Sequence, residues 1–435
     1  MRNSGLRSHV KPHLEESIPG HPQDDAENNV DLEIFQNFED LRPRQQEWDE
    51  FISSLNGEIF LTFDWCRTWW KYYGANRELL IFVFRSHGDI VAILPVFAEK
   101  LRIGPSAIRA VKFVGSDHLP ISFTVPIRPQ FIDKVVLRFM DELSQHVKWD
   151  ILHIGAICGR FDSFDDLLSS LEKTQSNRGM IRVTSGEVQT YFRLADSVED
   201  YIVGLELKYQ RKIRRYHRQI EKNNKILSSS FATAENVRDY FDSLVSMHQC
   251  QWRDAGQAGH FVDWPSSYDF HNEIAQIMAR LGRLRLLKIN IGSQCFGYQY
   301  AFKFSDYYCE FINARNYLKD FSSVSFSTVV FIEQARKALA ENIKLIDSMR
   351  GTYSYKMDLG GQLLPIKNIF VYREHLVRIS TFSISAWLLN LVYLKIWRRR
   401  LIPRLGLHPK PFWSTWIKSH VFAFCGLDKY FRKKL

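Results

Sequence analysis

The sequence predicts a mixed α/β protein in which two similar mixed sheets follow one another along the chain. Amphipathic helix patterns alternate with short apolar runs typical of strands, and several neighbouring runs are joined by Gly-containing turns that favour antiparallel hairpins. This alternation occurs twice. A chain of 435 residues, 45% of them apolar, is long enough for two cores of ordinary domain size.

The first half reads as helix, hairpin, helix and strand. Trp65, Trp69 and Tyr72 fall on one face of a helix, as core aromatics do. The predicted elements are a helical region over 45–75, strands at 79–84 and 90–98, a helix over 129–147 and a strand at 149–157.

The second half repeats the pattern. Its first long helix carries the apolar stripe Leu205, Tyr209, Ile213, Tyr216 and Ile220, and the next helix turns Val237, Tyr240, Phe241, Leu244, Met247 and His248 inward. The predicted elements are strand 188–194, helices 197–224, 234–252 and 267–281, strands 284–291, 295–304 and 307–313, helix 322–342 and strand 343–347.

These patterns divide the chain into four parts. We expect a disordered polar tail over 1–30 without the apolar core of a signal peptide, one α/β domain over 31–187, a second over 188–366, and a basic, apolar helical tail over 367–435.

The positive charge is concentrated in the C-terminal tail. The formal net charge is +10, but residues 367–435 hold 14 Lys/Arg against 2 Asp/Glu, so the rest of the chain carries about −2. Two apolar runs in the tail, 379–394 and 411–427, are each too short or too interrupted to suggest a membrane span. They favour either an interfacial hairpin on an anionic membrane or two helices packed on the body.

Composition argues against nucleic acid, metal ions and disulfides. The neutral body and the lack of a helix-turn-helix, zinc-finger or RNP pattern make nucleic acid a remote third alternative for the tail. The six cysteines are scattered without a CxxC pair or a His cluster, which argues against a metal site or a disulfide framework and favours a reducing cytosol.

Several segments, in order over residues 50–365, resemble GNAT-type N-acyltransferases of the CelD cellulose-biosynthesis group, distant relatives of the Fem peptidyltransferases. The segments are FDWCRTWWKYYG, ILPVF, FVGSD, WDILHIG, LKYQRKIRRYHRQIEK, SMHQCQWRDAG and IDSMRGTYSYKMDL. The resemblance implies a tandem GNAT-like fold and acyl-CoA, such as acetyl-CoA, as co-substrate without a metal. It does not include the tail.

Two positions depart from the family pattern. Where the family has Ser-Pro-Gly before a helix, this chain has Ser323-Val324-Ser325, and Gln251 stands where Arg is commoner. GNAT enzymes bind the pyrophosphate at such a helix start, so Ser322, Ser323 and Ser325 are the expected donor-binding residues, with hydroxyl groups in place of a close backbone approach.

In the transfer that the resemblance implies, an amine attacks the thioester directly. Such a site needs a base for the ammonium proton and an acid for the thiolate. The candidates for the base are Glu310, which alternatively points to water, and His248, which alternatively is a hydrogen-bonded core histidine. Tyr355 is the candidate acid.

The end of strand 343–347 is unusually rich in functional groups. Asp347, Arg350, Tyr353 and Lys356 are expected to line the cleft and, with Trp252, to bind substrate. The structural alternative is a turn in which Gly351 takes positive φ and Asp347 pairs with Arg350.

Two further features have open interpretations. The helix at 205–222 carries Lys208, Arg211, Lys212, Arg214, Arg215 and Arg218, which either steer an acidic substrate or form a solvated face. Asp117 and His118 are expected to cap a loop.

The predicted function is cytosolic acyl-CoA-dependent N-acyl transfer to an amino group of a sugar, amino acid or exopolysaccharide precursor, with the tail possible as a peripheral contact to the inner membrane. Two alternatives stay open. One is a catalytically silent accessory protein of polysaccharide biosynthesis, favoured by Ser-Val-Ser. The other is a Fem-like aminoacyl transferase, favoured by the basic helix.

Overall fold

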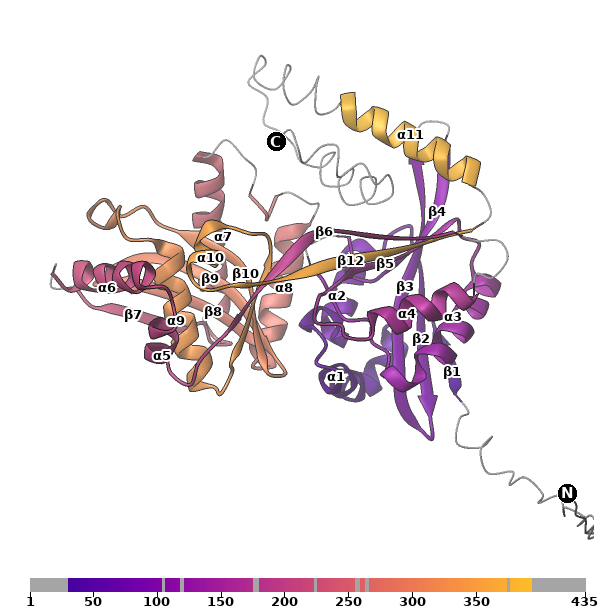
Figure 1. Ribbon diagram of the computed structural model, residues 1–435, viewed down its shortest axis with the longest axis horizontal. Coiled ribbons are helices and arrows are strands. Elements are labelled where there is room, and N and C mark those ends of the chain that lie inside the picture. The colour runs from indigo at the N-terminus through magenta and orange to yellow at the C-terminus, as the bar shows by residue number, and fades with distance from the viewer. Residues whose placement is uncertain are drawn as a thin grey trace, which may run out of the picture.

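The computed structural model describes residues 30–103, 106–117, 121–174, 180–222, 225–254, 259–262, 266–373 and 376–392. Two α/β halves lie side by side and are joined by two long strands (Figure 1). The predicted mixed α/β class with a tandem arrangement is confirmed. The expected disordered tail, His118 and the second apolar run at 411–427 lie outside the described residues.

The N-terminal half forms a sheet with helices on both faces, because Trp69 of α2 packs on Phe97 while Phe139 of α3 packs on Phe82 from the other side. Its strands are β1 (Asp31–Phe35), β2 (Glu78–Ser86), β3 (Asp89–Ile103), β4 (Ser106–Phe113) and β5 (Ile151–Ile157). Its helices are α1 (Gln45–Ser54), α2 (Phe63–Tyr73), α3 (Ile132–His146) and α4 (Phe164–Thr174), with short 3-10 turns η2 (Glu39–Arg44), η3 (Ile59–Leu61) and η4 (Pro129–Phe131).

The C-terminal half repeats this construction. Its strands are β7 (Leu227–Phe231), β8 (Leu284–Ile291), β9 (Gln294–Phe304), β10 (Tyr307–Arg315) and β11 (Leu345–Arg350). Its helices are α5 (Val198–Val203), α6 (Leu207–Lys222), α7 (Val237–Asp254), α8 (Ser267–Arg280), α9 (Phe326–Ala340) and α10 (Ser354–Asp358), with the turn η5 (Lys319–Phe321).

Two strands cross between the halves and make one continuous sheet. β6 (Met180–Arg193) pairs with β11, β12 (Gln362–Tyr372) pairs with β5, and the two pair antiparallel with each other. The order is β1-β2-β3-β4-β5-β12-β6-β11-β10-β9-β8-β7. The two separate sheets expected from sequence are therefore fused, and the predicted boundaries at 187/188 and 366/367 fall inside β6 and β12.

Each half contains one parallel strand pair in an otherwise antiparallel sheet. In the N-terminal half Ala110–Lys112 of β4 pair with Ile151–His153 of β5, and in the C-terminal half Tyr307–Cys309 of β10 pair with Leu345–Asp347 of β11. Parallel strands need a crossover, which α3 provides in one half and α9 in the other. The carboxyl ends of both strands of a pair thus lie at one sheet edge.

The observed helices and strands differ from the predicted ones at several places, for local reasons. The predicted helix 197–224 is two helices, because the chain leaves α5 at Gly204 before α6 begins at Leu207. Of its predicted stripe, Ile213, Tyr216 and Ile220 are buried. The sequence did not predict β1, β4, β7, β12, α4 and α10. β7, for example, is a short, half-exposed strand, LSSSF, without a continuous apolar pattern.

The beginning of the tail is an ordered helix, α11 (Leu376–Val392), which covers the far end of β3 and β4 (Figure 1). Ile379 and Phe382 pack there on Leu101 and Ile108. Within the part of the chain that the structure describes, no helix is both long and apolar enough to cross a bilayer.

Candidate functional site

The candidate site lies where β10 and β11 stop pairing. After Cys309 and Asp347 the two parallel strands share no ladder, and β10 has a bulge between Glu310 and Ile312. We call the region between residues 310–315 of β10 and 348–350 of β11 the strand gap. Because α9 is the crossover between these strands, its start and the segment after β11 lie at the same edge as the strand gap.

Glu310 is a buried carboxylate that bridges the strand gap. It is 6% exposed, accepts a hydrogen bond from Gln299 Nε2 at 3.0 Å on β9, and accepts another from the Ser348 hydroxyl on β11. Burial raises the pKa of Glu310, while these hydrogen bonds and the Lys356 charge oppose the rise. The group is therefore poised to exchange a proton nearer neutral pH than an exposed glutamate.

Tyr355 continues this arrangement toward the surface. Its phenol interacts with the Ser348 hydroxyl, and burial raises its pKa well above the usual value. Its ring stacks on Tyr353, with centroids 6.3 Å apart, and Tyr353 is 64% exposed. Glu310, Ser348 and Tyr355 thus form a chain of exchangeable protons that leads from the buried carboxylate to the half-buried phenol of Tyr355.

Lys356 holds the end of β11. Its ammonium donates to the carbonyls of Ser348, Met349 at 3.4 Å and Arg350 at 3.2 Å. The residue is 2% exposed, and burial lowers its pKa. Since Met349 has a left-handed φ of 59°, the strand turns sharply here, and the ammonium compensates for carbonyls that the lost ladder leaves unpaired.

Asp347 and Arg350 point to different partners. Asp347 is fully buried, where its carboxylate accepts from Gln189 Nε2 at 2.5 Å and from the Met349 amide at 2.8 Å; burial raises its pKa to about 7. Arg350 pairs with Glu187 at 2.5 Å and donates to the Ile121 carbonyl. The Asp347–Arg350 pair of the structural alternative is therefore wrong, although Gly351 does take a positive φ of 103°.

The start of α9 offers free amide groups at the same edge. Ser325 is the N-cap, accepting from the Thr328 amide at 3.4 Å, and the amides of Phe326 and Ser327 have no helical partner by geometry. Ser323 bonds Gln219 of α6 at 2.8 Å, so its side chain is directed at that helix, and Ser322 is exposed.

The basic helix α6 spans the distance between the two parts of the site. Lys212 pairs with Asp358 of α10 at 3.2 Å, and Gln219, about 10 Å further along the helix axis, reaches Ser323. Arg215 lies between them on the same helix face and is exposed. Lys212 and Arg215 therefore place positive charge between the start of α9 and the segment after β11.

The other two predicted site residues lie on the opposite face of the sheet. Gln299 points away from α7, because its neighbours Tyr298 and Tyr300 contact that helix, and Glu310 is bound to Gln299. His248 of α7 donates from Nδ1 to the Asn313 carbonyl at 3.1 Å and accepts the His260 amide at Nε2.

Burial lowers the pKa of His248 to about 4, so the ring is neutral with both nitrogens bonded. Trp252 packs on His260, with centroids 5.1 Å apart. The structure thus brings together Glu310, Tyr355, Lys356, Asp347 and Arg350 around β11, with Tyr353 outside them, and keeps His248 and Trp252 apart.

A groove of about 850 Å³ opens on this second face, beside α7 and the carboxyl end of β10. It combines two carboxylates with aromatic and sulfur-bearing side chains. The lining residues are Asp242, Ser243, Ser246, Met247, Cys250, Gln251, Asp254, Cys295, Tyr298, Arg315, Asn316 and Tyr317.

Sequence reasoning missed the residues that connect the predicted ones. Ser348 and Gln299 fix Glu310, and Gln189 fixes Asp347. The signal that could have found Gln299 was the hairpin register of β9 and β10. Glu310 lies opposite Ala301, and Gln299, two residues away, faces the same side of the sheet. No group of three potential metal ligands occurs among the residues described.

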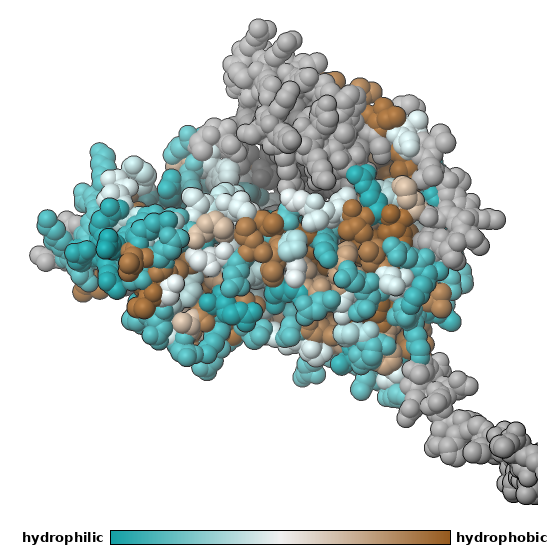
Figure 2. Space-filling view, in the orientation of Figure 1, coloured by the Kyte–Doolittle hydropathy of each residue, from teal (hydrophilic) through white to brown (hydrophobic). Residues whose placement is uncertain are grey.

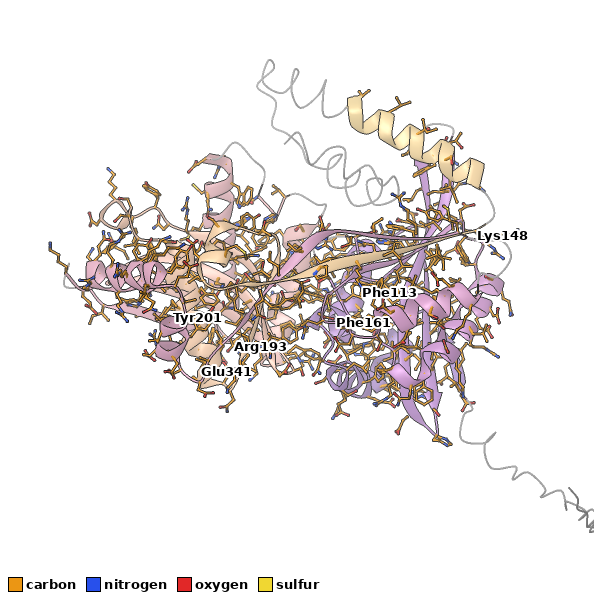
Figure 3. The ribbon with its side chains drawn as sticks, viewed as in Figure 1. Phe113, Lys148, Phe161, Arg193, Tyr201 and Glu341 are labelled. Carbon is orange, nitrogen blue, oxygen red and sulfur yellow. The ribbon has the colours of Figure 1, made fainter. Side chains whose placement is uncertain are left out.

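The opposite edge of the half has a different character. Glu341, labelled in Figure 3, binds Arg285 and Lys303 at 2.6 and 2.9 Å. At the edge of the strand gap, in contrast, Tyr201, also labelled there, donates from its hydroxyl to the Leu359 carbonyl, so α5 holds the segment that follows β11. The hydrogen bond of Tyr201 thus supports the site, whereas the ion pairs of Glu341 lie at the other edge of the sheet.

Comparison with known proteins places the site within a family signature. Residues 208–357 match the family model described as "Acetyltransferase (GNAT) domain". They include α6, α7, β10, α9 and Lys356, whereas the N-terminal half lies outside the match. No curated protein matches the sequence.

Among solved structures, FemX shows a similar fold at low sequence identity, and two further structures match less well. FemX is 11% identical with a TM-score of 0.55, covering 76% of this chain and 96% of that one. A conserved protein of unknown function from Bacteroides thetaiotaomicron VPI-5482 is 11% identical with a TM-score of 0.49, covering 76% and 97%. A tandem GNAT protein from the clavulanic acid biosynthesis pathway is 10% identical with a TM-score of 0.40, covering 79% and 99%. The CelD resemblance stays a prediction.

Proposed function

We propose that the chain is an acyl-CoA-dependent N-acyltransferase that acts on an amino group of a sugar, amino acid or exopolysaccharide precursor. The observation that carries the proposal is Glu310, a buried carboxylate with raised pKa that spans the strand gap in the half that matches the GNAT model. A base with a pKa brought toward neutrality suits the removal of a proton from an attacking amine.

The donor-binding residues fit a phosphate-bearing thioester. The N-terminal amides of α9 suit an anion. The Ser323 side chain is hydrogen-bonded to Gln219 of α6 and so points toward that helix. Arg215 and Lys212 add positive charge between the α9 start and the strand gap. Acyl-CoA would supply the activated acyl group there.

The residues around Glu310 have separate tasks. Glu310 accepts the proton of the amine through the Ser348 hydroxyl, and the Tyr355 phenol donates a proton to the leaving sulfur. Lys356 fixes the backbone of residues 348–350 and thereby positions Ser348. Asp347 and Arg350 anchor β11 to the neighbouring strand and loop, so we assign them positioning roles instead of the substrate contacts expected from sequence.

The groove beside α7 suits the amine-bearing acceptor. Asp242 and Asp254 attract a cationic ammonium group, and Tyr298 with Tyr317 supply the flat surfaces that sugar rings contact. Trp252, near the end of the same helix, packs on His260 and does not line the groove. Acceptor and donor then approach the strand gap from opposite faces of the sheet.

Titration of the full chain with acetyl-CoA by calorimetry tests donor binding. Ser325→Ala removes the N-cap of α9, which is worth about 1 kcal/mol, so binding should weaken roughly fivefold. Ser197→Ala is the matched control, because Ser197 caps α5 in the same way, accepting from the Asp200 amide, away from the donor residues. Absence of binding to the unmodified chain would favour the silent accessory protein.

Transfer from aminoacyl-tRNA is the second candidate function, favoured by the exposed cations of α6. Incubation with acetyl-CoA and a panel of amines, in parallel with charged tRNA, separates the two. Release of free CoA thiol that depends on an amine supports the first proposal; amine-dependent deacylation of tRNA alone would replace it with the second.

A further inference from the structure

Among the side chains that the structure describes, α11 carries apolar residues on two sides, one packed and one exposed. On the inner side Ile379 and Phe382 are 6% and 1% exposed against the ends of β3 and β4. Arg378 Nε donates to the Ala107 carbonyl at 2.8 Å and Ser385 lies 3.4 Å from Ser106, so the helix is held in one orientation.

The outer side presents a line of large aliphatic residues. Ile384, Leu388 and Val392 are 58%, 51% and 49% exposed, and their spacing of four places them on one stripe of the helix. We call these three residues the outer stripe. Figure 2 shows apolar colour over α11 at the upper edge of the molecule. An exposed contiguous apolar surface of this kind marks a contact site.

The charge of the sequence that follows the outer stripe indicates the kind of partner. α11 contains no acidic residue, and the sequence that follows it, 393–435, holds 11 Lys/Arg and one Asp. The remainder of the chain is close to neutral, so this concentration is confined to the end of the chain that carries the stripe. An exposed aliphatic stripe that is followed in the sequence by many cations matches a bilayer surface with acidic headgroups.

We propose that the outer stripe of α11 rests on an anionic lipid surface and orients the N-terminal half toward the membrane. The contact is interfacial. With 17 residues α11 is shorter than the roughly 20 that span a bilayer. The side chains of its inner side are packed against β3 and β4. The outer stripe alone enters the boundary between headgroups and acyl chains.

Sedimentation of the full chain with vesicles tests the proposal. We expect binding to vesicles of equal parts phosphatidylcholine and phosphatidylglycerol, and at least tenfold weaker binding to pure phosphatidylcholine or at high salt. The triple variant Ile384→Ser, Leu388→Ser, Val392→Ser should bind the anionic vesicles at least tenfold more weakly, because it removes the inserted area.

A matched control makes the same change elsewhere. Leu137, Val203 and Ile226 are 56%, 62% and 78% exposed and lie away from α11. The variant Leu137→Ser, Val203→Ser, Ile226→Ser should bind vesicles like the unmodified chain. A second variant, Arg398→Gln, Arg399→Gln, Arg400→Gln, should lose most of the preference for anionic lipid.

Three results would overturn the proposal. They are absence of binding to anionic vesicles, equal binding by the outer-stripe variant, and a dimer in solution that this variant abolishes in the absence of lipid. Acetyl-CoA titration of the outer-stripe variant distinguishes this proposal from acyl transfer, since the strand gap lies in the other half and donor affinity should not change.

Discussion

The two halves share one construction but fill the end of their parallel strand pair differently. In the N-terminal half the chain itself closes the space beside β5. Phe123 donates its amide to the Ala156 carbonyl at 3.0 Å and accepts the Cys158 amide at 3.0 Å, as an added strand would. Glu58 then fixes this segment through the Thr124 amide at 2.6 Å.

In the C-terminal half none of the segments that the structure describes pairs in this way, and side chains occupy the corresponding place. Glu310 and Ser348 meet across the strand gap, and Lys356 satisfies the carbonyls of β11. Side chains change rotamer or protonation more easily than a backbone segment leaves a sheet. The difference is consistent with the proposed chemistry lying in the C-terminal half, which is also the half that matches the GNAT model.

The largest expected effect contrasts the buried carboxylates of the two halves. Glu310→Gln preserves shape and removes the base, so the rate of acyl transfer should fall by about 10² to 10⁴ with little change in stability. Glu58→Gln should leave the rate near that of the parent and lower the stability, because Glu58 also binds Arg160 at 2.9 Å. Turnover and chemical denaturation of both variants measure this. Equal rate losses would show that the halves are not functionally distinct.

Removing the closing segment of the N-terminal half should damage stability alone. Phe123 is 1% exposed, and Phe123→Ala leaves a cavity that costs about 3 to 5 kcal/mol of unfolding free energy. Calorimetric titration should still give one donor site per chain. A second acetyl-CoA site in this variant would mean that only the segment prevents binding there.

Lys356→Met tests whether the ammonium organises the strand gap. Unpaired buried carbonyls cost about 1 to 3 kcal/mol each, so we expect a loss of roughly 3 kcal/mol in stability together with a lower kcat. Lys344→Met is the control, since Lys344 lies just before β11 but is 60% exposed; its unfolding midpoint should not move. A stable, fully active Lys356→Met variant would contradict the positioning role.

The sequence was sufficient for some parts of the fold and not for others. Strongly periodic elements such as α8 and β8 were predicted nearly to the residue, because burial on one face dictates their pattern. The crossing of β6 and β12 between the two halves was not predicted, since strand order depends on pairing between residues far apart in the chain. Glu310 and Lys356 could be named from the resemblance, but Ser348 between them could not, as its role follows from a bulge and from the left-handed turn at Met349.

The last prediction concerns the pH dependence of stability. It centres on Asp347, a buried acid of β11 whose strand pairs with the crossing strand β6. Burial raises the pKa of Asp347 to about 7 in the folded chain, from an ordinary value near 3.8. The folded state thus binds a proton that the unfolded state releases, so stability is highest at low pH and falls as pH rises between about 4 and 7, by up to about 1.4 kcal/mol per pH unit.

Asp347→Asn removes this dependence while its side-chain oxygen still accepts the Met349 amide. Denaturation at several pH values should therefore show a flatter profile for the variant, and the difference from the parent should vanish below pH 4, where both carry a neutral side chain. A Glu187→Gln variant, which alters the exposed partner of Arg350, should keep the parent's slope. An unchanged slope in Asp347→Asn would mean that another buried acid, with Glu310 the first candidate, governs the pH dependence of the strand gap.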